Sequence, residues 1–162
     1  MIKIDQIDRA IVILLQEDGR MSCSEIARRI GNVSGRVVRY RIDRLIQENV
    51  VQVGAIVNPK ALGFNVMADI YMEVELGYVG GVARAMAAHE RVSYVAVSTG
   101  DKDLSIQVYA RTAEDLHRFL TGVIADMPGV RKTSTVLLPE KLKDVYDWHI
   151  PDSCAESKED NL

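Results

Sequence analysis

Cysteine and histidine are scarce in this chain of 162 residues. The two cysteines, Cys23 and Cys154, are widely separated, and the three histidines are equally scattered, at His89, His117 and His149. Neither pattern has metal-ligand spacing, and two such distant cysteines are more typical of free thiols than of a disulfide. We therefore expect no metal site and no bound cofactor.

Long apolar stretches are also missing. Every apolar run is far below the ~20 residues that cross a bilayer, and residues 1–9 lack the apolar core of a signal peptide. An apolar fraction of 48% and a charged fraction of 27% are typical of a soluble globular protein. These features predict a cytoplasmic protein of one ordinary domain or two small ones.

A first amphipathic helix is predicted near the N-terminus. Asp5 is a candidate for its cap, and Asp18–Gly19 a candidate for its end. Its apolar residues recur at three- and four-residue steps, at Ile4, Ile7, Ile11, Leu14 and Leu15.

Two further short helices, joined by a tight turn, are predicted from residues 21–45, which read MSCSEIARRIGNVSGRVVRYRIDRL. Ser22 and Glu25 have the spacing of a capping box for the first of them. Gly31–Asn32 ends that helix, and Ser34 begins the next. The second helix should bury its apolar positions, which are Val38, Ile42, Leu45 and Ile46.

The solvent-facing side of this second helix has a distinctive composition. A small residue, two arginines and a tyrosine on such a face fit insertion into a DNA major groove. The alternative is a solvated helix pair with surface arginines. The residues of this outer face are Gly35, Arg36, Arg39, Tyr40 and Asp43.

Local charge favours the DNA-binding interpretation. Residues 20–44 contain seven arginines against two acidic residues, a net charge of +5, whereas the whole chain has a net charge of -3. A basic segment in an acidic chain is typical of a surface that contacts phosphates.

A strand is predicted at residues 50–57, where β-branched residues are frequent. It is either a wing of the helical module or a hinge that leads out of it. Asn49, just before it, can adopt the left-handed conformation at the end of the third helix. Residues 1–58 are thus expected to form a winged helix-turn-helix, with a connector at residues 59–65.

Residues 66–150 predict a second module of the α+β class. Their hydrophobic patterns follow the order β-α-β-β-α-β, a ferredoxin-like antiparallel sheet with both helices on one face. The other face is expected to carry the odd positions of the first strand, such as Tyr71, with Thr133, Thr135 and Leu137 of the last. Its mixed polarity favours pairing with a partner chain. Residues 151–162 are polar and acidic and predict a disordered tail.

The order of these motifs resembles the Lrp/AsnC family of prokaryotic transcription regulators. The similarity runs from about Ile4 to Tyr146, through IDQIDRAIVILLQEDGR, SEIARRIGNVSGRVVRYRIDRLIQENVV, VNPKALGF, STGDKDLSIQV and MPGVRKTSTVLL. The chain departs from the family pattern at Asn49, where glycine is usual, and at Lys102, where a bulky residue is frequent.

The resemblance implies a regulator that pairs through its sheets and binds double-stranded DNA as a homodimer. It also implies higher homo-oligomers, such as an octamer, and a small-molecule effector, often an amino acid, near contacts between dimers. Ser34 then occupies the serine that starts the recognition helix, and Arg41 and Leu45 the arginine and leucine further along it.

The candidate DNA contacts divide by position. Arg36, Arg39 and Tyr40, with Gly35 beside them, are expected to meet the groove, and Ser34 to cap the helix, contact a phosphate, or both. Phosphate contacts are expected from Arg28, Arg29, Arg41 and Arg44. For Arg41, the alternative is an ion pair inside the domain, to Asp43 or to a carboxylate of the first helix. Arg20 is as well suited to a structural role.

The effector site is expected at residues 98–103. The candidates are Ser98, Thr99, Gly100, Asp101, Lys102 and Asp103, whose amides and charges suit the two ends of an amino acid. The same residues are also good turn formers between two strands, so a plain turn remains open. Thr133 and Thr135 either complete the pocket or occupy the sheet face.

An enzyme and a module without DNA binding are the two alternative functions. A side branch with the same layout decarboxylates sirohaem, but the isolated histidines and the basic helix argue against an enzyme. A ligand-binding or assembly module without DNA binding is disfavoured by the +5 segment.

Overall fold

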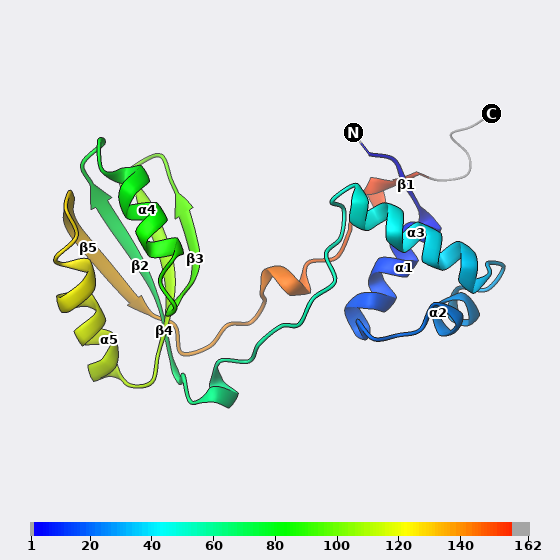
Figure 1. Cartoon of the computed structure of the whole chain (residues 1–162), viewed down its shortest axis with the longest axis horizontal. Helices are drawn as coiled ribbons and strands as arrows, with labels where there is room; N and C mark the ends of the chain where they lie inside the picture. The colour runs from blue at the N-terminus through cyan, green and yellow to red at the C-terminus, as the bar shows by residue number, and fades with distance from the viewer. Residues whose placement is uncertain (1, 157–162) are drawn as a thin grey trace. The chain divides into compact units, whose positions relative to one another are not determined.

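The computed structural model describes residues 2–156, which form two compact units (Figure 1). The first unit contains the chain up to Ile56 together with the segment from Leu142 onward, and the second contains Val57–Lys141. Among the described residues, no helix is long and apolar enough to span a membrane.

Three helices form most of the first unit, as predicted. Asp5 caps α1 through a reciprocal capping box with Asp8. Asn49 has a φ of 55°, the left-handed conformation expected of it. The helices are α1 (Gln6–Glu17), α2 (Cys23–Ile30) and α3 (Gly35–Gln47).

The core of the first unit is built from the apolar faces of these helices. Ile11, Ile26 and Val38 are completely buried in one cluster, and Leu45 is completely buried in another. Ile46, expected in the core, is instead 42% exposed. It lies one position beyond Leu45, where the 3.6-residue period has already turned the side chain outward.

The prediction of a strand at residues 50–57 is wrong for the single chain. No strand is assigned there. The backbone N–H groups of Val50 and Val51 donate to the Leu45 carbonyl, which closes α3, and both side chains pack beside Leu45. Residues 52–57 are exposed, so their β-branched side chains have no sheet to join within the chain.

The strands of the first unit come from the two ends of the described chain. Ile4–Asp5 (β1) pairs in parallel with Ala155–Glu156 (β6), and a short turn at Asp152–Cys154 (η4) precedes β6. The prediction of a disordered tail is therefore wrong for residues 151–156, while residues 157–162 lie outside the described part.

The segment before β6 is fixed to α1, which shortens the second unit relative to the expected 66–150. The Arg9 side chain donates from Nε to the Ile150 carbonyl at 2.9 Å and pairs through Nη1 with Asp152 at 2.8 Å. The amide of Gln16 donates to the Trp148 carbonyl, and Ile150 packs against the cluster around Leu45. Composition alone did not reveal this docking, because the contacts join residues more than 130 positions apart.

The second unit has the predicted β-α-β-β-α-β order, with strand order β3-β4-β2-β5 and antiparallel pairing throughout. Both helices cover one face of the sheet (Figure 1). The elements are η1 (Lys60–Leu62), β2 (Val66–Val74), α4 (Val79–Ala87), β3 (Val92–Val97), β4 (Leu104–Ala110), α5 (Ala113–Phe119), its π-helical extension η2 (Leu120–Ile124), and β5 (Val130–Leu137).

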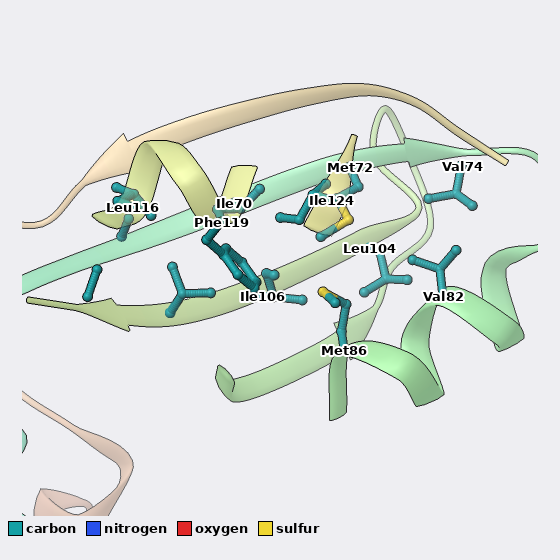
Figure 2. Close-up of a cluster of buried hydrophobic side chains, with 13 residues drawn as sticks. Ile70, Met72, Val74, Val82, Met86, Leu104, Ile106, Leu116, Phe119 and Ile124 are labelled. Atoms are coloured by element: carbon teal, nitrogen blue, oxygen red, sulfur yellow. The ribbon is translucent and has the colours of Figure 1, made fainter. Parts of the chain in front are cut away.

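The core of this unit lies between the sheet and the two helices. Figure 2 shows Val82 and Met86 of α4 and Phe119 of α5 directed toward the sheet. Met86 is completely buried, as is Leu104 of β4. This packing leaves the opposite face of the sheet without a helix.

The last strand presents different residues to that open face than expected. Thr133, Thr135 and Leu137 lie opposite Met72, Ile70 and Ala68, and residues directly opposite in an antiparallel pair share a face. They are therefore on the helix side. The open face carries Lys132, Ser134 and Val136 instead. Because both faces of β5 are mixed in polarity, its sequence did not fix which side faces the core.

Candidate nucleic-acid interface and ligand loop

The recognition helix α3 is held by its cap and by a close approach to α2. The Ser34 hydroxyl accepts a hydrogen bond from the Val37 backbone at 3.3 Å, so its role as cap is confirmed. A Cβ atom on Gly35 would lie 3.4 Å from the Ser24 nitrogen, which shows how closely the first turns of the two helices meet. A small residue at position 35 allows this contact.

The outer face of α3 carries side chains that are free to bind. Arg36 and Arg39 are exposed, Tyr40 is 68% exposed, and Val37 between them is 40% exposed. Among residues 2–156, neither Arg36 nor Arg39 has an ion-pair partner. Two unpaired guanidinium groups and a phenol therefore share one exposed surface.

The two arginines on the inner side of α3 have a different environment. Nη1 of Arg41 lies 2.8 Å from Asp5 Oδ2 and 2.8 Å from Asp8 Oδ1, and Nη2 of Arg44 pairs with the other Asp8 oxygen. The Asp8 side chain is only 2% exposed. The structure thus favours the ion-pair alternative for Arg41 and extends it to Arg44, which was expected on a phosphate.

These ion pairs fix α3 against the start of α1. Burial opposes ionisation of Asp5, but the Asp8 backbone N–H and the Arg41 guanidinium outweigh it, so the pKa of Asp5 is lowered. Burial likewise opposes the charge on Arg41, yet its bonds to Asp8 and Asp5 raise its pKa. Arg41 and Arg44 are therefore positioning residues in the free protein.

Arg28 and Arg29 on α2 are exposed but engaged. Both pair with the Glu25 carboxylate, and Arg29 also pairs with Glu17 at 2.9 Å. These hydrogen bonds from Arg28 and Arg29 lower the pKa of Glu25 to about 2. Arg20 is 95% exposed, with a loose 3.7 Å contact to Asp18.

The sequence suggested a carboxylate of the first helix as one possible partner of Arg41, which Asp8 confirms. It missed the acidic partners of Arg28, Arg29 and Arg44. The spacing of Glu25 from Arg28 and Arg29, at i+3 and i+4, is a local signal that could have revealed the pairs on α2. Asp8 and Arg41 are 33 positions apart, and no local pattern links them.

The predicted ligand loop connects β3 to β4, and its own side chains hold it together. The Ser98 hydroxyl donates to the Lys102 carbonyl at 2.8 Å. The Asp103 carboxylate accepts from the Val74 backbone N–H at 2.8 Å, and its own N–H donates to the Met72 carbonyl. Asp103 is thus bound to the C-terminal end of β2.

Of the remaining loop residues, Lys102 forms an ion pair and the other three form an exposed tip. Lys102 pairs through Nζ with Glu73 at 2.6 Å, and this bond lowers the pKa of Glu73 against the opposing effect of burial. Thr99, Gly100 and Asp101 are exposed, and Gly100 has a φ of 136° that favours glycine.

Thr133 and Thr135 are not brought together with the loop in one chain. Both are exposed on the edge strand β5, and β2 lies between β5 and the loop-bearing strand β4. Within residues 2–156, no three His, Cys, Asp or Glu side chains converge on a possible metal site. Both cysteines are free thiols.

Comparison with known proteins identifies both units. Residues 4–46 match the AsnC-type helix-turn-helix domain, and residues 67–147 match the Lrp/AsnC ligand binding domain. The chain belongs to the Lrp/AsnC family. It is therefore a DNA-binding transcription regulator with a ligand-binding domain, and the predicted order of a helix-turn-helix followed by a ferredoxin-like domain is confirmed.

Similar Lrp/AsnC proteins cover nearly the whole chain. An HTH-type transcriptional regulator of Pyrococcus abyssi is 41% identical over 146 residues, which are 90% of this chain and 92% of the relative. The regulator FL11 of the same species is 33% identical over 150 residues, covering 92% of this chain and 98% of FL11.

Solved structures agree in fold. AsnC of E. coli matches with a TM-score of 0.81 at 23% identity, covering 88% of this chain and 97% of AsnC. The regulator NMB0573 of Neisseria meningitidis, solved as a complex with L-Met, matches with a TM-score of 0.81 at 20% identity, covering 88% and 94%.

Proposed function

We propose that α3 reads DNA in the major groove through Arg36, Arg39 and Tyr40. The observation that carries this proposal is the absence of ion-pair partners for Arg36 and Arg39 among the described residues. Neighbouring arginines of α2 and α3, in contrast, are paired with carboxylates. A free guanidinium on a helix face binds the N7 and O6 atoms of guanine with two donors. Tyr40 adds an exposed ring and hydroxyl on the same surface.

Phosphate contacts come from the two helices around this face. Arg28 and Arg29 are exposed enough to exchange Glu25 for a phosphate, and the N-terminus of α3 with Ser34 offers backbone donors. Arg41 and Arg44 act indirectly, by holding α3 against α1 through Asp5 and Asp8. A regulator of this kind works where the chromosome is, in the cytoplasm of a prokaryotic cell.

A second copy of the chain is the partner of the open sheet face. Tyr71, Tyr94 and Val136 are 36%, 56% and 45% exposed there, beside the hydrogen-bonded pair Asp69–Gln107. Pairing of two such faces buries the aromatic rings and gives a homodimer with two recognition helices. Higher homo-oligomers, such as an octamer, follow from further contacts between dimers.

Val136→Asp tests this assembly in the full-length protein. A carboxylate on the open face should convert dimers to monomers in light scattering. Val53→Asp, at an exposed position of the segment after α3, is the control with the same chemical change. If Val136→Asp stays dimeric, the two copies do not pair through this face.

The ligand is a small zwitterion, most simply an amino acid, held at the exposed tip of the ligand loop. Thr99 and Gly100 offer backbone N–H groups for its carboxylate, and Asp101 offers a carboxylate for its ammonium group. The L-Met bound to the Neisseria meningitidis relative supports an amino acid as the ligand class. Thr133 and Thr135, exposed on an edge strand, are supplied to the site by a neighbouring copy.

Selection of bound sequences from random DNA, with and without a mixture of the twenty amino acids, tests both halves of this proposal. We expect an enriched pseudo-palindrome whose half-sites are spaced by whole helical turns, and an amino-acid-dependent change in its recovery. If no sequence is enriched, the proposal of specific DNA readout is wrong. If the same sequences are recovered equally well with and without amino acids, the proposal of an amino-acid ligand is wrong.

A further inference from the structure

The Glu25 carboxylate lies between two arginines on the surface of α2. Its Oε1 atom is 2.6 Å from Nη2 of Arg28 and 3.1 Å from Nε of Arg29, and its Oε2 atom is 2.9 Å from Nε of Arg28. The arginine side chains are 74% and 44% exposed. One carboxylate thus occupies two guanidinium groups that face solvent.

The Glu25 carboxylate does not complete the capping box that its spacing from Ser22 predicts. Ser22 caps α2 by accepting from the Glu25 backbone N–H, but within the described residues the Glu25 side chain does not return the bond to Ser22. It is committed to the arginines instead, which is why the pKa of Glu25 falls to about 2. At neutral pH it is fully ionised.

Glu25 lies close to the start of α3, the helix proposed to read DNA. The first turns of α2 and α3 lie close together, since a Cβ atom on Gly35 would lie 3.4 Å from Ser24, one position from Glu25. A phosphate that binds the Nε–Nη2 edge of Arg28 or the Nε donor of Arg29 must displace Glu25, because Glu25 occupies these donors. The negative charge of Glu25 then remains next to the DNA. That charge retains a cation from solution, so fewer cations are released when the complex forms.

We propose that Glu25 restrains Arg28 and Arg29 and thereby weakens the sequence-independent binding of this regulator to DNA. The inference rests on the proposed phosphate contacts of Arg28 and Arg29. Arg36 and Arg39, which read bases, are left free, so the restraint falls on the contacts that carry no sequence information. A weak hold on random DNA leaves more protein available for its specific site, because genomic DNA offers a vast excess of competing sites.

Glu25→Gln tests the restraint in the full-length protein with a duplex of random sequence. Glutamine is nearly isosteric and is still compatible with the start of a helix. We expect binding about 3- to 10-fold tighter at ~0.1 M salt, and a salt dependence steeper by about one unit of slope. Unchanged affinity would overturn the proposal.

Two controls make the result specific. Glu114→Gln removes the same charge from another exposed pair, with Arg118 at 3.3 Å in the ligand-binding unit, and should leave affinity unchanged. Glu17→Gln frees only one contact of Arg29, and its gain should be smaller than that of Glu25→Gln. If Glu114→Gln increases DNA affinity as much as Glu25→Gln does, the effect comes from net charge alone and the proposal is wrong.

A double-mutant cycle separates restraint from simple repulsion. Arg28→Ala should cost more affinity in the Glu25→Gln protein, where Arg28 is free, than in the wild type, where it is held. Equal costs in both backgrounds would mean that Glu25 does not act through Arg28. If the wild-type protein binds no DNA at all, the proposed function fails, which is a different result from binding that Glu25→Gln leaves unchanged.

Discussion

The outer face of α3 and the loop between β3 and β4 are both candidate binding sites, but their polar groups are in opposite states. Arg36 and Arg39 have no ion-pair partner among the described residues, whereas Lys102 and Asp103 bind Glu73 and the Val74 backbone. A site with free groups is ready for its ligand. A site with satisfied groups binds through its exposed tip, or only after rearrangement.

The same division exists inside the DNA-binding unit. Arg41 and Arg44 are fixed by Asp5 and Asp8 at the start of α1, and Arg9 is fixed by the segment before β6. The outer face of α3, in contrast, presents two arginines that are not fixed. Free and fixed groups should therefore respond differently to mutation. Loss of a fixed group should reduce stability, and loss of a free one should reduce binding alone.

The largest expected effect is that of Asp8→Ala. This change removes the closest partner of the half-buried Arg44 and leaves Arg41 with Asp5 alone, which we expect to cost about 3–5 kcal/mol of unfolding free energy. Urea unfolding measures it. Asp43→Ala, at an exposed position of α3, should change stability by under ~0.5 kcal/mol. Comparable losses from both variants would contradict the distinction.

Removal of residues 148–162 should come next, because it deletes the fixed partners of Arg9 and Gln16 and the packing of Ile150. We expect the DNA-binding unit to lose about 3 kcal/mol of stability, the order of one large buried side chain. Thermal unfolding checks this, with removal of residues 157–162 alone as the control. A truncated protein as stable as the control would mean that the segment does not hold α1.

Arg39→Ala tests the free class. It should leave the unfolding free energy unchanged and cost about 2 kcal/mol of binding at the preferred sequence, with relaxed sequence preference. Arg44→Ala is the matched arginine from the fixed class, and it should lower stability. Binding measured by fluorescence anisotropy and stability measured by urea should therefore separate the two variants. If both variants change DNA binding and stability in the same way, the distinction between the two sides of α3 is wrong.

Asp103→Ala and Asp101→Ala compare the fixed and exposed carboxylates of the ligand loop. Asp103→Ala leaves the Val74 N–H without its acceptor, which we expect to cost about 1–2 kcal/mol of stability. Asp101→Ala should leave stability unchanged and weaken amino-acid binding in calorimetry. If Asp103→Ala weakened binding without loss of stability, Asp103 would belong to the ligand contacts instead.

The smallest expected effect is a pH dependence at Glu25. Because its pKa is lowered to about 2 in the folded chain, its pairs with the arginines stabilise α2 above pH ~4.5, and this contribution is lost as the pH falls toward 2. Carboxyl chemical shifts of Glu25 should show a midpoint near 2. Arg28→Ala should move that midpoint upward, and a normal midpoint in the wild type would disprove the pair in solution.

The sequence by itself determined the elements and their order. Apolar spacing predicted α1, α2 and α3, and cap residues at Asp5, Ser22 and Ser34 predicted where they begin. The alternation of the later strands predicted the ferredoxin-like unit. These signals are local, because helix caps and periodicity depend on residues within a few positions of one another.

Only the tertiary structure decided which arginines are free. Helical spacing separated Arg36 and Arg39 from Arg41 and Arg44, but it assigned all four to DNA contacts. Only the structure shows that Asp5 and Asp8 bind the last two. The docking of residues 148–156 on α1, the missing strand at residues 50–57 and the face of Thr133 were also hidden from the sequence. Each depends on a partner supplied from far along the chain or not supplied at all, and local sequence patterns carry no information about such partners.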